Sequence, residues 1–85
     1  MKYEVHWDAR AEADLAAVWL AAADRHAVGR AATWFDDQLA RSPLQLGESR
    51  VSTVHRLAYY SPLGIEFEVI EDDKRVIVQA VFATN

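Results

Sequence analysis

The sequence of 85 residues contains no cysteine, and this absence removes several classes of protein. Disulfide-stapled scaffolds, thiol nucleophiles and zinc or iron–sulfur sites built on cysteine are excluded. Three glycines and two prolines are too few for a low-complexity linker or a collagen-like fibre. The longest apolar run covers only residues 15–23, whereas a helix needs about 20 apolar residues to cross a bilayer. We therefore expect no membrane partner.

Positive charge is also scarce. Lys and Arg number 9 against 13 Asp and Glu, so the net charge is −4. Residues 1–47 and 48–85 share this charge evenly, and no basic arm stands out. Proteins that bind nucleic acid directly usually carry a basic patch, so the composition argues against that partner. Acids at Glu4 and Asp8 and the lack of a leading apolar block argue against a secretory signal and predict a cytoplasmic location.

The residues that are present predict one domain spanning residues 1–85. Hydrophobic residues make up 52% and charged residues 26%, which are globular proportions, and the length is too short for two domains. Residues 2–7 alternate like a half-buried strand. Residues 8–22 and 24–41 repeat apolar side chains at helical spacing, with Asp8 and Asp24 as predicted N-caps.

The pattern changes to strands after Pro43. Residues 43–48 are predicted to form a loop, and residues 52–60, 63–69 and 75–82 are predicted strands. In the second of these, Leu63, Ile65, Phe67 and Val69 should face the helices, while Glu66 and Glu68 face outward. Because two helices precede three strands, the order β-α-α-β-β-β predicts an α+β fold. We expect a helical hairpin packed on one face of a mostly antiparallel four-stranded sheet.

Several aromatic side chains receive specific predictions. Trp19 and Phe35 lie on apolar helical stripes and are predicted core residues. Trp34 falls at the edge of its stripe, where a tryptophan can anchor a partner. Of the neighbouring Tyr59 and Tyr60, we expect one in the core and the other at a wet rim. Together with Arg56, the three residues Trp34, Tyr59 and Tyr60 form the predicted partner-binding set.

The ordered motifs resemble the RelE/ParE superfamily of bacterial type II toxin–antitoxin toxins. The segments that carry the likeness are Val5-His6-Trp7, Asp14-Leu15 with Val18-Trp19, Ser42-Pro43, Leu46-Gly47-Glu48-Ser49-Arg50 and Pro62-Leu63 with Phe67 and Val69. Within that superfamily the chain is similar to small ParE-like or plasmid-stabilisation proteins. The resemblance implies a toxin-like protein held silent by a cognate antitoxin.

The resemblance leaves two activities open. RelE-like members cut ribosome-bound mRNA without a metal, using clustered Lys and Arg, whereas ParE-like members poison DNA gyrase. The nuclease candidates here are Arg50, His55 and Arg56, but the arginine expected near residues 64–66 is missing. We therefore favour protein binding, to an antitoxin and to DNA gyrase, over an enzyme. An mRNA endonuclease and an inactive orphan are the alternatives.

The basic cluster also has a simpler explanation. Arg50 and Arg56 can pair with nearby acids on a solvated sheet face, and such surface pairs are common and weak. His55 and Arg56 are neighbours on a predicted strand, so their side chains should point to opposite faces. The histidines His6, His26 and His55 lack the spacing of metal ligands, and we expect no metal and no cofactor.

Overall fold

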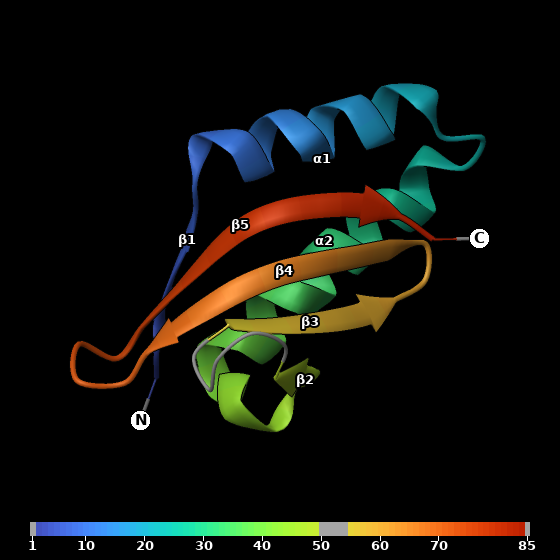
Figure 1. Cartoon of the computed structure of the whole chain (residues 1–85). Helices are drawn as coiled ribbons and strands as arrows, with labels where there is room; N and C mark the ends of the chain where they lie inside the picture. The colour runs from blue at the N-terminus through green and yellow to red at the C-terminus, as the bar shows by residue number, and fades with distance from the viewer. Residues whose placement is uncertain (1, 50–54, 85) are drawn as a thin grey trace.

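The computed structural model describes residues 2–49 and 55–84 (Figure 1). The elements are, in order, β1 (Glu4–Trp7), α1 (Ala9–Ala21), α2 (Arg25–Arg41), a 3-10 turn (Pro43–Gln45), β2 (Glu48–Ser49), β3 (His55–Tyr60), β4 (Leu63–Ile70) and β5 (Arg75–Ala83). The strands form one sheet in the order β1-β5-β4-β3-β2. Neighbours are antiparallel except for β1 and β5, which are parallel. The predicted α+β class and element order are confirmed.

The edge beyond β3 differs from the expected loop. Two residues of the predicted loop and its flank, Glu48 and Ser49, pair with β3 as the short strand β2 and add a fifth strand. Gly47 precedes them with φ +72°, and a Cβ at that position would lie 2.1 Å from the carbonyl oxygen of Leu57. The backbones of residues 47 and 57 can approach this closely because residue 47 has no side chain. Residues 52–54 of the strand predicted over 52–60 lie outside the described residues.

Both helices begin as the sequence predicts. The Asp8 carboxylate accepts a hydrogen bond from the Ala11 amide at 2.8 Å, and Asp24 accepts from the Ala27 amide at 3.1 Å. Each bond satisfies one of the amides that the first helical turn leaves unpaired. At the other end of α1, Arg25 donates to the carbonyl oxygens of Trp19 and Leu20. These bonds hold the two helices in a tight hairpin.

The core lies between α2 and the sheet. Helix α2 crosses behind the strands (Figure 1) and buries four side chains at helical spacing, Val28, Ala31, Phe35 and Leu39. Leu63, Ile65, Phe67 and Val69 of β4 are buried against it, while Glu66 and Glu68 stay partly exposed on the opposite face. The predicted facing of β4 is therefore confirmed.

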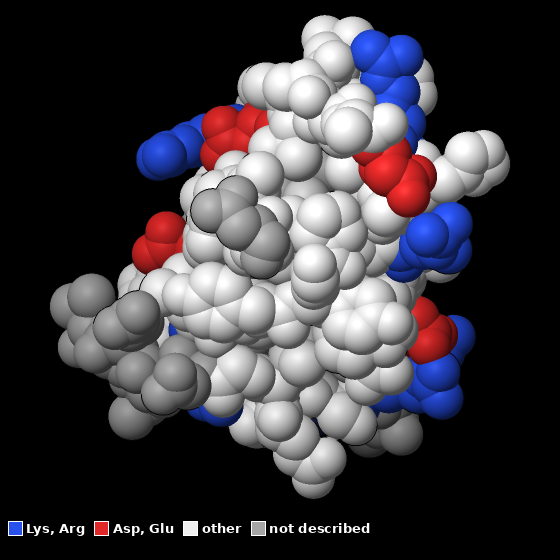
Figure 2. Space-filling view, turned by 90° about the vertical axis from the view of Figure 1, so that its right-hand side faces the viewer, with Lys and Arg blue, Asp and Glu red and all other residues white. Residues whose placement is uncertain are grey.

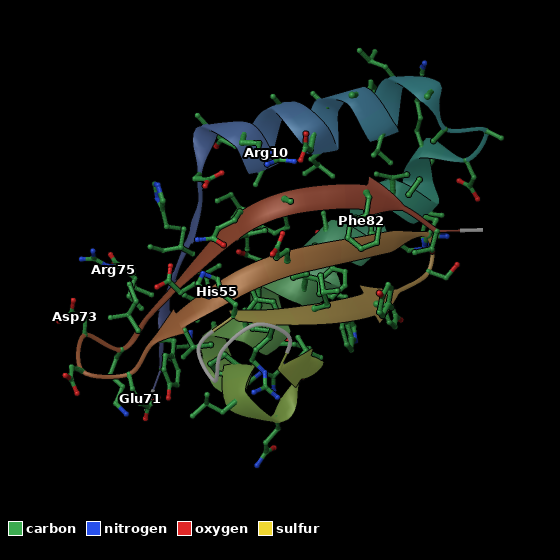
Figure 3. All side chains as sticks on the ribbon, viewed as in Figure 1. Arg10, His55, Glu71, Asp73, Arg75 and Phe82 are labelled. Atoms are coloured by element: carbon green, nitrogen blue, oxygen red, sulfur yellow. The ribbon has the colours of Figure 1, made fainter. Side chains whose placement is uncertain are left out.

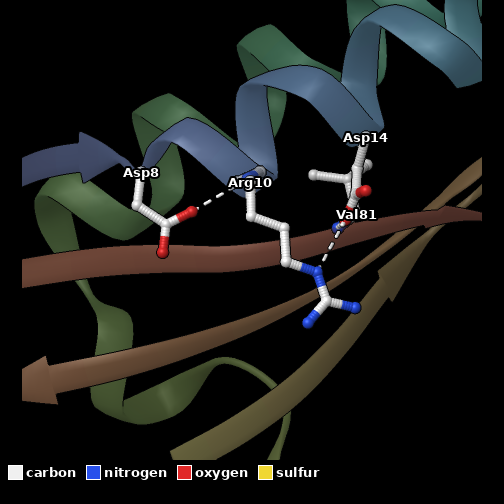
Figure 4. A network of polar contacts seen from close by, with 5 residues as sticks. Asp8, Arg10, Asp14 and Val81 are labelled. Atoms are coloured by element: carbon white, nitrogen blue, oxygen red, sulfur yellow. Dashed lines mark hydrogen bonds and ion pairs between the residues drawn. The ribbon is translucent and has the colours of Figure 1, made fainter.

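Helix α1 lies along β5 instead of crossing the sheet (Figure 1). Strand β1 pairs with residues 75–78 only, and its ladder ends where the Asp8 amide donates to Val78. Beyond that point the Asp14 carboxylate accepts from the Val81 amide at 3.1 Å, and Arg10 lies 3.7 Å from Asp14 (Figure 4). Asp14 thereby satisfies an amide of β5 that has no strand beside it.

The prediction that Trp19 lies in the core is wrong. Its side chain is 41% exposed, whereas Phe35 is fully buried as expected. The sheet-facing side of α1 carries Ala11, Val18 and Ala22, and Trp19 is rotated about 100° from Val18. Its indole lies under the guanidinium of Arg25, 4.7 Å from the ring centroid. Trp19 therefore marks the exposed side of the hairpin.

Within residues 2–49 and 55–84, neither helix is long and apolar enough to span a membrane.

Candidate functional site

We call the face of the sheet opposite α2 the outer face, and the nuclease candidate His55 lies on it. Strands β3 and β4 alternate, and their register places six residues on this face: His55 opposite Glu68, Leu57 opposite Glu66, and Tyr59 opposite Gly64. None of the six is Lys or Arg. The guanidinium of Arg75 lies toward the β4–β5 turn, away from His55 (Figure 3), and is 3.8 Å from the Glu4 carboxylate.

A small polar cluster occupies the middle of the outer face. The Gln79 amide donates to Glu68 at 3.1 Å, and Nε2 of His55 lies 4.0 Å from the same carboxylate oxygen. All three side chains are half-buried. An imidazole held beside a carboxylate can transfer a proton, but cleaving a phosphodiester also requires cations that stabilise the charge developing on the phosphate. Of the described residues, His55, Glu68 and Gln79 make up this cluster, and none of them is Lys or Arg.

Arg56 and His55 lie on opposite faces, as predicted. The guanidinium of Arg56 turns toward the chain after α2, where it donates to Leu46 O at 2.9 Å and to Gly47 O at 3.1 Å. These bonds tie the 3-10 turn and β2 to β3. The structure thus does not bring Arg56 and His55 to one phosphate, and Arg50 lies outside the described residues.

An aromatic surface forms where β3 ends. The rings of Trp34 and Tyr60 stack with centroids 4.0 Å apart and planes 4° from parallel, and Trp34 also meets Phe35 edge-on. Tyr59 points the other way and contacts Phe82 at 5.9 Å between centroids (Figure 3 labels Phe82). We call Trp34, Tyr59, Tyr60 and Phe82 the aromatic surface.

The expectation that one of the two tyrosines is buried is wrong. Tyr59 is 54% exposed and Tyr60 is 42% exposed. Strand β2 pairs only with Arg56 and Leu57, so among the described residues no strand lies beside the last three residues of β3 on the side away from β4. Because α2 covers one face of β3 only and no described strand lies on the side away from β4, both rings remain accessible.

The end of the molecule that carries these residues is mostly uncharged. Figure 2 shows this end, with Lys, Arg, Asp and Glu confined to its margins. A shallow apolar hollow of about 610 Å³ opens there between the helical hairpin and the end of β5. Its lining includes Val18, Ala22, Val28, Pro62 and Ala83. Such an apolar surface, adjoining exposed aromatic rings, is typical of a protein-binding site.

A second polar cluster, at the opposite end, is one that sequence reasoning missed. The Tyr3 hydroxyl donates to Glu71, Lys74 donates to the other oxygen of Glu71 at 3.0 Å, and the Lys74 ammonium lies 5.2 Å from the centre of the Tyr3 ring. The hydrogen bond from Tyr3 lowers the pKa of Glu71, and Glu71 in turn raises the pKa of Tyr3 and of Lys74. All three groups are near the β4–β5 turn, where Figure 3 labels Glu71.

Sequence reasoning missed this cluster because its residues come from separate elements. Lys74 follows Glu71 by three residues, a spacing that signals a turn pair, but Tyr3 is brought in by the parallel pairing of β1 with β5. Among the described residues as a whole, no three His, Asp or Glu side chains lie close enough together to bind a metal ion.

Comparison with known proteins gives matches in structure only. No family model and no curated protein matches the sequence. The RelBE2 toxin–antitoxin complex of Mycobacterium tuberculosis contains a chain that matches with a TM-score of 0.78 at 19% identity, over 98% of this chain and 99% of that one. A chain of the chromosomal ParDE system of P. aeruginosa matches with a TM-score of 0.72 at 16% identity, covering 98% and 97%.

A third match points the same way. A chain of the intact E. coli RelBE toxin–antitoxin complex matches with a TM-score of 0.69 at 17% identity, over 98% of both chains. The three matches span almost the whole of each chain. The chain therefore has the fold of the RelE/ParE toxin superfamily.

Proposed function

We propose that this chain is the toxin-like component of a type II toxin–antitoxin pair and that it acts by binding proteins. Its partners would be a cognate antitoxin and, as the cellular target, DNA gyrase. The likeness to toxins crystallised with their antitoxins supports the antitoxin. With these partners it would act in the cytoplasm.

The observation that carries this proposal is the charge of the outer face. The paired positions of β3 and β4 present Glu66 and Glu68 with a single histidine and no Lys or Arg. A nuclease must neutralise phosphate charge as it binds, and it must stabilise more charge as the phosphodiester breaks. Acidic side chains at these positions oppose both, whereas protein binding needs no cluster of cations.

The aromatic surface supplies what protein binding needs. Exposed Tyr and Trp side chains are the residues most often found as interface anchors. Beside them, residues 58–60 of β3 pair with β4 on one side and have no strand among the described residues on the other, so this free edge can pair with an extended segment of a partner. Arg56 contributes by holding β2 and the 3-10 turn that border this edge.

The activity is tested in a reconstituted translation extract with mRNA 5′ ends mapped, alongside a DNA gyrase supercoiling assay. We expect no codon-specific cuts and inhibition of supercoiling. Cuts that disappear in His55→Ala, a change on the outer face that leaves the core intact, would restore the nuclease alternative. Growth during expression with and without the protein of the adjacent gene tests the antitoxin.

The aromatic surface is tested by Tyr60→Ala and Trp34→Ala. Each change should weaken binding of the adjacent-gene protein by about 2 kcal/mol or more, because each removes a stacked ring from the surface. Leu44→Ala is the matched control, since Leu44 is an equally exposed apolar residue in the 3-10 turn. Equal affinities for all three variants would remove the aromatic surface from the proposal.

A further inference from the structure

Apolar side chains surround two carboxylates on the outer face of the sheet. The carboxylates belong to Glu66 and Glu68, which point the same way from β4 because they are two residues apart. The strands on either side, β3 and β5, contribute four apolar side chains to this face, all half-buried or exposed: Leu57, Tyr59, Ile77 and Phe82. We call these six residues the carboxylate frame. Figure 3 views this face and labels Phe82 on it.

The two carboxylates of the frame differ in their partners. Glu68 accepts a hydrogen bond from Gln79 at 3.1 Å and lies 4.0 Å from Nε2 of His55. Within residues 2–49 and 55–84, by contrast, the Glu66 side chain makes no hydrogen bond and no ion pair. The residue opposite Glu66 on β3 is Leu57, whose side chain has nothing to donate. The half-buried carboxylate of Glu66 is therefore available to a partner.

Two aromatic rings border Glu66 along its strand. Gly64 precedes Glu66 by two residues and faces the same way. Tyr59 lies opposite Gly64 on β3, and Phe82 lies opposite it on β5. A Cβ at position 64 would lie 2.4 Å from the Phe82 ring, so that ring lies over the glycine. The rings of Tyr59 and Phe82 meet edge to face with their centroids 5.9 Å apart, and the Tyr59 ring is exposed.

A partner that covers this frame must bring a cation to Glu66. Burying an unpaired carboxylate is costly, because no protein group then replaces the water that solvates it. Covering the apolar side chains of the frame is favourable in itself. The net charge of −4 adds a longer-range attraction for a basic segment. The frame therefore fits a cationic side chain with apolar neighbours, and it repels a phosphate-bearing strand.

Arginine meets these requirements better than lysine. Its planar guanidinium can bind both oxygens of one carboxylate, and it can stack on an aromatic ring at the same time. Glu66 offers the carboxylate and Tyr59 offers the ring. The guanidinium is also less strongly hydrated than an ammonium group, so an interface that covers it loses less hydration energy.

We propose that the carboxylate frame holds the cellular protein target, through an arginine of the target that pairs with Glu66 and lies against Tyr59. This inference rests on the proposed function, because it assigns a surface to the same target. The residues that flank this arginine are apolar and cover Leu57 and Ile77. Because Tyr59 belongs both to the frame and to the aromatic surface, an antitoxin that covers the aromatic surface excludes the arginine of the target.

The probe is a pair of blocked tripeptides, Leu-Arg-Leu and Leu-citrulline-Leu, because citrulline has the shape of arginine without its charge. In amide NMR titrations we expect saturable shifts at Leu57, Gly64 and Glu66. The arginine peptide should bind about fivefold more tightly, and added salt should reduce this preference. Equal affinities for the two peptides, shifts confined to other faces or no saturable binding would overturn the proposal.

Glu66→Gln identifies the carboxylate that is responsible. The change keeps the shape of the side chain and removes its charge, so both peptides should bind with the affinity of the citrulline peptide. The thermal midpoint should not change, because Glu66 has no partner among the described residues. Glu12→Gln is the matched control, since Glu12 is an exposed acid on the side of α1 that faces α2. It should keep the preference for arginine. A preference that persists in Glu66→Gln would contradict the assignment.

A supercoiling assay with the same variants separates this inference from the proposed function. If the unaltered protein inhibits DNA gyrase and Glu66→Gln inhibits it equally well, the proposed function stands and the frame is not the target surface. If inhibition is lost in Glu66→Gln and kept in Glu12→Gln, both are supported. If the peptides bind as described while neither gyrase nor the adjacent-gene protein is bound, the frame is a receptor for arginine and the proposed function fails.

Discussion

Two aromatic residues of the hairpin, Phe35 and Trp19, differ in burial and should differ in their contribution to stability. Phe35 is fully buried between α2 and the sheet, so Phe35→Ala should lower the free energy of unfolding by about 3–5 kcal/mol. Trp19 is 41% exposed and stacks on Arg25, so Trp19→Ala should cost about 1–2 kcal/mol. Urea denaturation measures both, and Phe35→Leu provides a milder variant that stays folded.

The Tyr3 cluster predicts a specific dependence on pH. Glu71 has a pKa below its ordinary value of 4.5, so its stabilising effect is present above that value and is lost as the pH falls through the lowered pKa. Tyr3 and Lys74 have raised pKa values, so their effect is present below about pH 10 and is lost as the pH rises through the folded-state values.

Tyr3→Phe tests this cluster. The stability difference between the unaltered protein and the variant should be largest between about pH 5 and 9 and should shrink on both sides of that range. When both proteins also carry Glu71→Gln, the stability difference should no longer shrink at low pH, because the carboxylate that titrates there is absent. A difference that stays constant from pH 3 to 11 would contradict the assigned coupling.

At the scale of elements, Asp14 links α1 to β5 by accepting a hydrogen bond from the Val81 amide. Asp14→Ala should cost about 1–3 kcal/mol, because it leaves the Val81 amide without an acceptor. Asp14→Asn keeps a carbonyl oxygen and should cost less. Arg10→Ala should have a small effect of about 0.5 kcal/mol, because the Arg10 side chain is 77% exposed. Urea denaturation gives the ranking, and faster hydrogen exchange at Val81 in Asp14→Ala identifies its cause.

Replacing Gly29, in contrast, is expected to stabilise the protein. Gly29→Ala should raise the free energy of unfolding by about 0.5–1 kcal/mol, because alanine favours the helix and its Cβ has open space around it. Gly47→Ala is the contrasting variant and should destabilise the protein, because residue 47 has a positive φ and lies against the backbone of Leu57. Thermal unfolding of the two variants distinguishes a glycine that is replaceable from one that the fold requires.

The elements were predictable where one local pattern decides them. Alternation in residues 63–69 specified which face of β4 is buried, and Asp8 and Asp24 marked the helix starts. Strand β2 was missed because two residues carry no periodicity, and its pairing depends on Arg56 and Gly47. Trp19 was misplaced because α1 lies along β5, which narrows its buried stripe to small residues.

The candidate surfaces were less predictable than the fold. The sequence correctly predicted that His55 and Arg56 lie on opposite faces, because consecutive side chains of a strand point to opposite faces. The exposure of both Tyr59 and Tyr60 depends on how far β2 extends, which only the assembled sheet reveals. The Tyr3 cluster combines residues from separate elements, and no local pattern of the sequence relates them.

At the scale of the whole molecule, charge and apolar surface are separated. Glu66 and Glu68 lie on the outer face at the paired positions of β3 and β4, whereas the end seen in Figure 2 is mostly uncharged. A partner that binds this end therefore buries apolar side chains and few charges.

The parallel pairing of β1 with β5 also sets when this protein can become folded during its synthesis. Strand β5 lies between β1 and β4, and it follows both in the chain. A ribosome-bound chain that stops before residue 75 contains β1, both helices and β4, but it lacks β5, which joins β1 to β4 in the sheet. Pairing β1 with β5 also closes a loop of most of the chain, and contacts so far apart in sequence form slowly. Stalled nascent chains of increasing length should therefore stay sensitive to protease until β5 has emerged. The surfaces that the sheet and the helical hairpin build together can therefore form only after the last strand has been synthesised.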